Sequence, residues 1–126
     1  MYNVSIVNSG SSDFQVLSEG QGFKLDTKGS GASPSAAFLA SLGACIGVYL
    51  RKYFHGAKIE SKGFDIKVEA DFEKEPRYHF QEINVSIDLK GLELEERRKQ
   101  ALLRFVENCP VHNTIKSNPD VKIKIV

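Results

Sequence analysis

The chain has 126 residues, of which 41% are hydrophobic and 26% are charged, and its formal net charge is +1. This length and balance predict one globular domain over residues 1–126 and exclude disorder as the main state. A net charge so close to zero supplies no strong positive field. We therefore expect no nucleic-acid partner held through phosphate contacts.

Residues 1–20 contain no Lys or Arg, so no positively charged segment precedes an apolar stretch there. This pattern predicts that the chain carries no secretory signal. The longest apolar-rich run, residues 36–50, is about 15 residues long, whereas a membrane span needs about 20. We therefore expect a cytoplasmic protein without a membrane partner.

The first third of the chain predicts three short strands followed by a helix. Residues 2–7, 14–17 and 23–25 have strand-like patterns separated by turn residues, which indicates an antiparallel meander. Ser33 and Pro34 then suit the N-cap and the first position of a helix. Apolar residues cover most of this helix, so we expect it to be largely buried, and its small residues to let another element approach closely.

The rest of the chain predicts a hairpin, a second helix and a last strand. Residues 63–73 alternate apolar and charged side chains, and the return strand changes phase at residues 81–82, which predicts a β-bulge. A helix follows over residues 93–108, and Pro110 prevents its simple continuation. Residues 121–125 alternate as a strand does.

The predicted order is therefore βββ-α-ββ-α-β, an α+β fold in which antiparallel β-sheets pack on two long helices.

The two cysteines are the residues best suited to chemistry. Cys45 lies inside the first helix, and Cys109 follows the apolar stripe of the second. Each is open to interpretation as a buried packing residue, because free cysteine is among the most buried residue types. If the two helices pack together, the thiols could instead meet within disulfide reach, as a peroxidatic and resolving pair requires. Cys109 could also cap a short helical turn, whose free N–H groups would favour its thiolate.

Metal and cofactor binding are not expected. His55, His79 and His112 share no zinc-ligand spacing with each other or with the cysteines. The Gly- and Ser-rich loop over residues 28–33 lacks the Gly-Lys-Ser/Thr ending of a phosphate-binding loop. His112 is close enough in sequence to Cys109 to be a candidate base for it.

Three segments carry a family resemblance: Ala-Ser-Pro at residues 32–34, Leu-Gly-Ala-Cys at 42–45 and Cys-Pro-Val at 109–111. With them the chain resembles the OsmC-like proteins, which include osmotically inducible protein C and the organic hydroperoxide resistance proteins. The order of elements agrees along nearly the whole chain.

This resemblance implies a thiol peroxidase that reduces organic hydroperoxides during oxidative stress. Cys45 would be the peroxidatic residue, which becomes a sulfenic acid, and Cys109 would resolve it as a disulfide. An external dithiol would then reduce the pair. The resemblance also implies an intertwined homodimer with its sites at the subunit interface, and it makes Phe38 and Tyr49 candidates for lining an apolar peroxide pocket.

Two departures from the family pattern concern the charge partner of the reactive thiolate. Catalytic members usually place Glu directly after the Pro. This chain has Ser35 at that position, and Ser35 is a further candidate for lining the pocket. They also supply an Arg from the N-terminal meander, whereas residues 1–23 here contain no basic residue. Lys24, Arg51 and Arg77 are the candidate substitutes.

Because a buried thiol without a charge partner reacts poorly, two alternatives stay open. One is a non-catalytic dimer of the same fold that binds a small apolar or thiol-bearing ligand. The other is a structural dimer with inert core thiols.

Overall fold

The computed structural model describes residues 2–126. The chain divides into two compact units, the first ending at Ala40 and the second spanning Ser41–Val126. Helix α1 (Pro34–Gly56) runs from the first unit into the second. The single domain expected over residues 1–126 stays a prediction.

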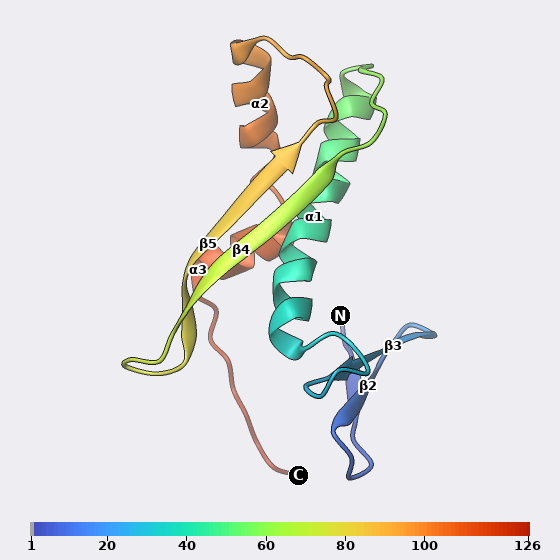
Figure 1. Cartoon of the computed structure of the whole chain (residues 1–126), viewed down its shortest axis with the longest axis vertical. Coiled ribbons are helices and arrows are strands. Elements are labelled where there is room, and N and C mark those ends of the chain that lie inside the picture. The colour runs from blue at the N-terminus through green and yellow to red at the C-terminus, as the bar shows by residue number, and fades with distance from the viewer. Residues whose placement is uncertain (1) are drawn as a thin grey trace. The chain divides into compact units, whose positions relative to one another are not determined.

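The first unit contains a three-stranded antiparallel sheet. Its strands are β1 (Ser5–Val7), β2 (Asp13–Ser18) and β3 (Gln21–Asp26), in the order β1-β2-β3 (Figure 1). The predicted meander is confirmed, although β1 begins at Ser5 rather than at residue 2. Val16, on the central strand β2, is buried.

Two side chains shape the connection from β3 to α1. The buried Asp26 carboxylate accepts hydrogen bonds from the Lys28 N–H, at 2.8 Å, and from the Ser30 hydroxyl, and these bonds lower the pKa of Asp26. Ser33 Oγ accepts from the Ala36 N–H at 3.1 Å, and Pro34 is the first helical residue. The predicted cap of α1 is thereby confirmed.

The second unit packs a two-stranded ribbon and three helices around one core. The ribbon pairs β4 (Asp65–Glu73) with β5 (His79–Asp88) and lies alongside α1 (Figure 1). The helices α2 (Glu96–Val106) and α3 (Pro110–Ser117) complete the unit. The core cluster is formed by Leu42, Ile46, Leu50, Phe54, Leu102, Val106 and Cys109.

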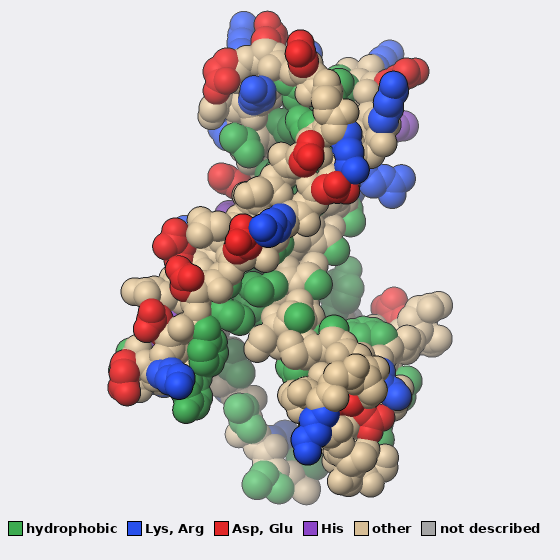
Figure 2. All heavy atoms as spheres, in the orientation of Figure 1, with side chains coloured by type: hydrophobic (Ala, Val, Ile, Leu, Met, Phe, Trp, Pro, Cys, Tyr) green, Lys and Arg blue, Asp and Glu red, His purple; other side chains and the backbone are tan. Residues whose placement is uncertain are grey.

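The ribbon has one wet face, as its sequence predicts. Along β4 and most of β5 half-buried residues alternate with exposed ones, and Figure 2 shows charged side chains along the exposed face. The predicted bulge is confirmed: Asp71 pairs with Glu82 and Phe72 with Phe80, which leaves Gln81 as the extra residue.

Two glycines of α1 let β4 approach the helix backbone. A Cβ atom added at Gly43 would lie 3.0 Å from Val68 Cγ2, and one added at Gly47 would lie 3.4 Å from Ile66 Cδ1. The first distance is shorter than ordinary contact, whereas the second is at its lower limit. The expectation that small residues permit close approach is confirmed.

Helix α1 is less buried in this chain than its sequence predicts. Val48 is 50% exposed on the face away from the core. The helix is also longer than the apolar run that marks it, because the segment from Arg51 to Gly56 continues it. By length and composition alone α1 could cross a membrane, but the core helix of a soluble protein passes the same test.

The prediction of a last strand over residues 121–125 was wrong. Residues 121–125 form no strand in the part of the chain that the structure describes, and Ile123 is 92% exposed. Their alternating pattern fits a strand, but a strand is stable only when it pairs with another, and residues 2–126 offer this segment no partner. Helix α2 is also shorter than predicted, beginning at Glu96 rather than Glu93.

The close approach of β4 predicts different outcomes for alanine at the two glycines. Both changes gain helix propensity of about 1 kcal/mol. In Gly43→Ala the new methyl group also crowds Val68, so we expect the gain to be largely lost, while Gly47→Ala should be the more stable variant by about 1 kcal/mol. Urea unfolding of both variants measures this difference. Equal stability of the two would contradict the packing described here.

Candidate active site

The structure brings the two cysteines together in the core of the second unit. Cys45 lies on α1 and is half-buried, whereas Cys109 lies between α2 and α3 and is fully buried. Both thiols are free, and Cys45 packs against the core cluster that contains Cys109. The two cysteines therefore share one core, while disulfide reach between their sulfur atoms stays a prediction.

Cys109 is held by the ends of two helices. Its N–H donates to the Val106 carbonyl at 3.2 Å, and its Sγ accepts from the His112 N–H at 3.4 Å. Pro110 stands at the first position of α3, where a missing N–H costs no helical bond. The predicted short helical turn capped by Cys109 is confirmed.

The N–H groups at the start of α3 favour the Cys109 thiolate, as expected, but burial outweighs them. Burial raises the pKa of this thiol, and its hydrogen bond with Cys45 raises it further, while the His112 N–H acts in the opposite direction. The net result is a raised pKa, because loss of solvent outweighs the N–H groups at the start of α3. Cys109 therefore keeps its proton at neutral pH.

The three candidate cations have other places in the structure. Lys24 Nζ lies 3.7 Å from Asp13 Oδ2, within the first unit. Arg51 is exposed and lines a hollow with Phe54 and Phe64; six positions beyond Cys45, it lies on a different face of α1. Arg77 is exposed in the loop between β4 and β5, where its carbonyl contacts the His79 ring at 2.6 Å. None of them is among the groups that most influence the Cys109 thiol.

Two other predicted roles are addressed by the structure. The His112 ring contacts the Glu107 carbonyl through Nδ1 at 3.2 Å. Among the described residues this is the only hydrogen bond of the ring, so the ring forms none with Cys109, for which it was a candidate base. Within residues 2–126, no group of three or more His, Cys, Asp or Glu side chains could hold a metal ion.

The candidate pocket residues lie along α1. Ser35 and Phe38 are exposed near its start, in the first unit. Tyr49 is half-buried in the second unit, where its ring packs on that of Phe105 at a centroid distance of 5.9 Å. Lys52 Nζ lies 4.6 Å from the centre of the same Tyr49 ring. Tyr49 therefore belongs to the α1–α2 contact that also contains the thiols.

An apolar hollow that the sequence analysis missed is lined by residues of α1, β5 and α3. It has a volume of about 410 Å³. Leu42 and Ile46, which flank Cys45 along α1, form one wall, and His112 lies at another. The remaining lining residues are Phe80, Gln81, Ile83, Val85, Ile115 and Lys116. The only sign of this hollow in the sequence was the run of alternating apolar residues in the return strand, such as Ile83 and Val85. That pattern could not indicate that α3 would leave part of the apolar face of β5 uncovered.

The unequal burial of the two thiols predicts unequal alkylation. We expect iodoacetamide to modify Cys45 in the folded protein well before Cys109, because Cys109 is inaccessible and protonated. Peptide mapping after limited labelling identifies the modified residue, with Cys45→Ser as the control. Folded Cys45→Ser should label slowly, and its rate should rise only at alkaline pH. Faster labelling of Cys109 than of Cys45 would contradict the burial described here.

The fold has close counterparts among solved structures. An OsmC-like protein from Mycoplasma pneumoniae is 22% identical, with a TM-score of 0.79, over 92% of this chain and 87% of that chain. The organic hydroperoxide resistance protein OhrB of Bacillus subtilis is 20% identical, with a TM-score of 0.67, over 96% of both chains. The organic hydroperoxide resistance protein OsmC from Legionella pneumophila is 23% identical, with a TM-score of 0.66, over 97% of this chain and 95% of that chain.

None of the curated proteins matches the chain. The family model described as OsmC-like protein, however, matches residues 27–124, which include both cysteines and all of α1, α2 and α3. The match and the shared α+β fold agree with the resemblance found in the sequence, and the chain belongs to the OsmC-like protein family.

Proposed function

We propose that the protein is a cysteine-based peroxidase that reduces organic hydroperoxides through Cys45 and Cys109. The observation that carries this proposal is that two free cysteines, one half-buried and one fully buried, pack in one core. Family membership supports it, because solved proteins of this fold include two named for organic hydroperoxide resistance.

In the first step Cys45, as its thiolate, attacks the terminal peroxide oxygen. The O–O bond breaks, an S–O bond forms, and the departing alkoxide takes up a proton to give an alcohol. The sulfur is oxidised to a sulfenic acid. The protonated Cys109 thiol is a hydrogen-bond donor in the same core.

In the second step the Cys109 sulfur attacks the sulfur of the Cys45 sulfenic acid. An S–S bond forms, the S–O bond breaks, and water leaves with the thiol proton. An external dithiol then reduces the disulfide by two thiol–disulfide exchanges and is itself oxidised to a disulfide. Packing of both side chains in one core favours this step, because disulfide formation requires the two cysteines to be neighbours.

The apolar hollow lined by α1, β5 and α3 suits the organic part of such a peroxide. Leu42 and Ile46 come from the helix that carries the reactive sulfur, and Val85 extends the apolar wall on the ribbon. An alkyl or aryl group would bury apolar surface here, whereas hydrogen peroxide would not. We therefore expect a preference for organic hydroperoxides.

We propose that the active form is a cytoplasmic homodimer. The exposed apolar face of α1, which includes Val48 at 50% exposure, favours association with a second copy. A cytoplasmic location would supply the reducing conditions that regenerate the thiols. Analytical ultracentrifugation tests the dimer directly.

The mechanism predicts distinct products for the two cysteine variants. With one equivalent of cumene hydroperoxide, the reduced protein should lose both thiols and two hydrogens by intact mass. Cys45→Ser should keep its one remaining thiol and its mass unchanged and show no peroxidase activity, because the attacking sulfur is absent. Cys109→Ser should retain the first step and accumulate a sulfenic acid or an intermolecular disulfide. Free-thiol counts, with hydrogen peroxide in parallel, complete the measurement.

Full turnover by Cys45→Ser would overturn the mechanism. Thiols that persist in the wild-type protein would favour the second candidate, a non-catalytic dimer that binds a small apolar or thiol-bearing ligand. One observation supports that candidate: Lys24, Arg51 and Arg77 have other neighbours than the thiols.

A further inference from the structure

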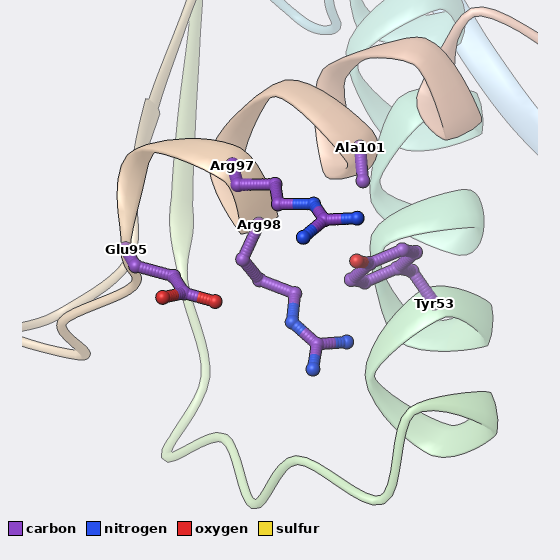
Figure 3. A pocket seen from close by; sticks show the side chains of 5 residues that line it. All are labelled: Tyr53, Glu95, Arg97, Arg98 and Ala101. Atoms are coloured by element: carbon purple, nitrogen blue, oxygen red, sulfur yellow. The ribbon is translucent and has the colours of Figure 1, made fainter.

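We propose that Tyr53, Arg97 and Arg98 form a second binding site, for a small organic anion that carries a carboxylate or a phosphate group. The three residues line a hollow of about 330 Å³ between α1 and the start of α2, together with Glu95 and Ala101. Figure 3 shows both guanidinium groups extending from α2 toward the side of α1 that carries the Tyr53 ring.

Arg97 and Arg98 are exposed, and their guanidinium groups are unpaired within the part of the chain that the structure describes. Among the residues that the structure describes, neither group forms an ion pair or a hydrogen bond. Glu95 also lines the hollow, yet it is bonded to neither arginine. Two forked donors on one hollow match the oxygens of a carboxylate or phosphate, which arginine binds in a bidentate manner.

Arg97 and Arg98 lie in the first turn of α2, where the helix dipole disfavours cations. Glu96 is the first residue of α2, so Arg97 and Arg98 occupy its second and third positions. The N-terminal end of a helix carries partial positive charge, and Glu95 at the N-cap makes no side-chain hydrogen bond there. Residues that break a local rule of this kind concentrate at functional sites. An anion in the hollow would interact favourably with the guanidinium groups and with the helix end.

The Tyr53 ring forms a rigid aromatic wall of the hollow, because other rings pack on it. Tyr53 is half-buried, and its ring packs on Phe105 at a centroid distance of 5.5 Å. It also packs on Phe54 at 6.4 Å. A ring fixed in this way offers a preformed surface to the apolar body of a ligand, and the small side chain of Ala101 leaves that surface open.

This hollow is separate from the two-cysteine site. Neither Cys45 nor Cys109 lines it, and Arg98 and Cys109 lie at opposite ends of α2, which rises about 1.5 Å per residue. The proposal therefore stands independently of the peroxidase chemistry, and its test requires no activity measurement.

The test is a titration of the full-length protein with phenyl phosphate, benzoate and inorganic phosphate at constant ionic strength. Isothermal calorimetry reports affinity, and amide chemical shifts at the start of α2 report location. We expect saturable binding of at least one organic anion. Arg98→Gln should weaken it about tenfold, because a charge-assisted hydrogen bond is lost. Lys99→Gln, which removes the same charge from the next residue outside the hollow, should leave it unchanged.

Two further variants sharpen the result. Glu95→Gln removes the one carboxylate that lines the hollow and should strengthen binding, while Tyr53→Ala should weaken the organic anions more than inorganic phosphate. Preference for phenyl phosphate or for benzoate assigns the head group. Absence of saturable binding overturns the proposal. Equal weakening by Arg98→Gln and Lys99→Gln also overturns it, because the effect would then be diffuse surface charge. Circular dichroism confirms that each variant is folded.

Discussion

The packing of α1 against its neighbours in the second unit is the constraint on which the candidate site depends. Gly43 and Gly47 allow β4 to lie against one side of the helix, and Leu50 is fully buried in the core that α1 shares with α2. The stripe that carries Cys45 packs against the core cluster that includes Cys109. Cys109 follows the end of α2 and is the N-cap of α3, which begins at Pro110. The shared core of the two cysteines is thus a consequence of helix packing rather than of any local motif.

That core makes two identical functional groups chemically different. Cys109 is fully buried and its pKa is raised, so it remains a proton donor, whereas Cys45 keeps partial access to solvent. A two-cysteine mechanism needs this asymmetry, because the first sulfur must meet the peroxide and the second must wait for the sulfenic acid. The N–H of His112 bonds the Cys109 sulfur without reversing the effect of burial. Its main contribution is therefore to hold the sulfur in place.

Features that depend on local chemistry could be predicted from the sequence. The Ser33 cap, the bulge at Gln81 and the helical turn after Cys109 each follow from residues a few positions apart. Features that depend on distant partners could not. The alternating residues 121–125 carry a correct strand pattern but find no strand to pair with among residues 2–126. The apolar hollow was missed for the same reason, since it depends on how α3 leaves the ribbon partly uncovered.

The two sites share one geometric origin. Cys45, Tyr49 and Tyr53 are spaced four residues apart, so they follow one stripe of α1 along its contact with α2. Phe105 contacts both tyrosines and joins the two ends of that contact. At one end the stripe meets a buried thiol, and at the other it meets two unpaired guanidinium groups. Because these rings are already packed, one helix pair positions both sites without any ligand.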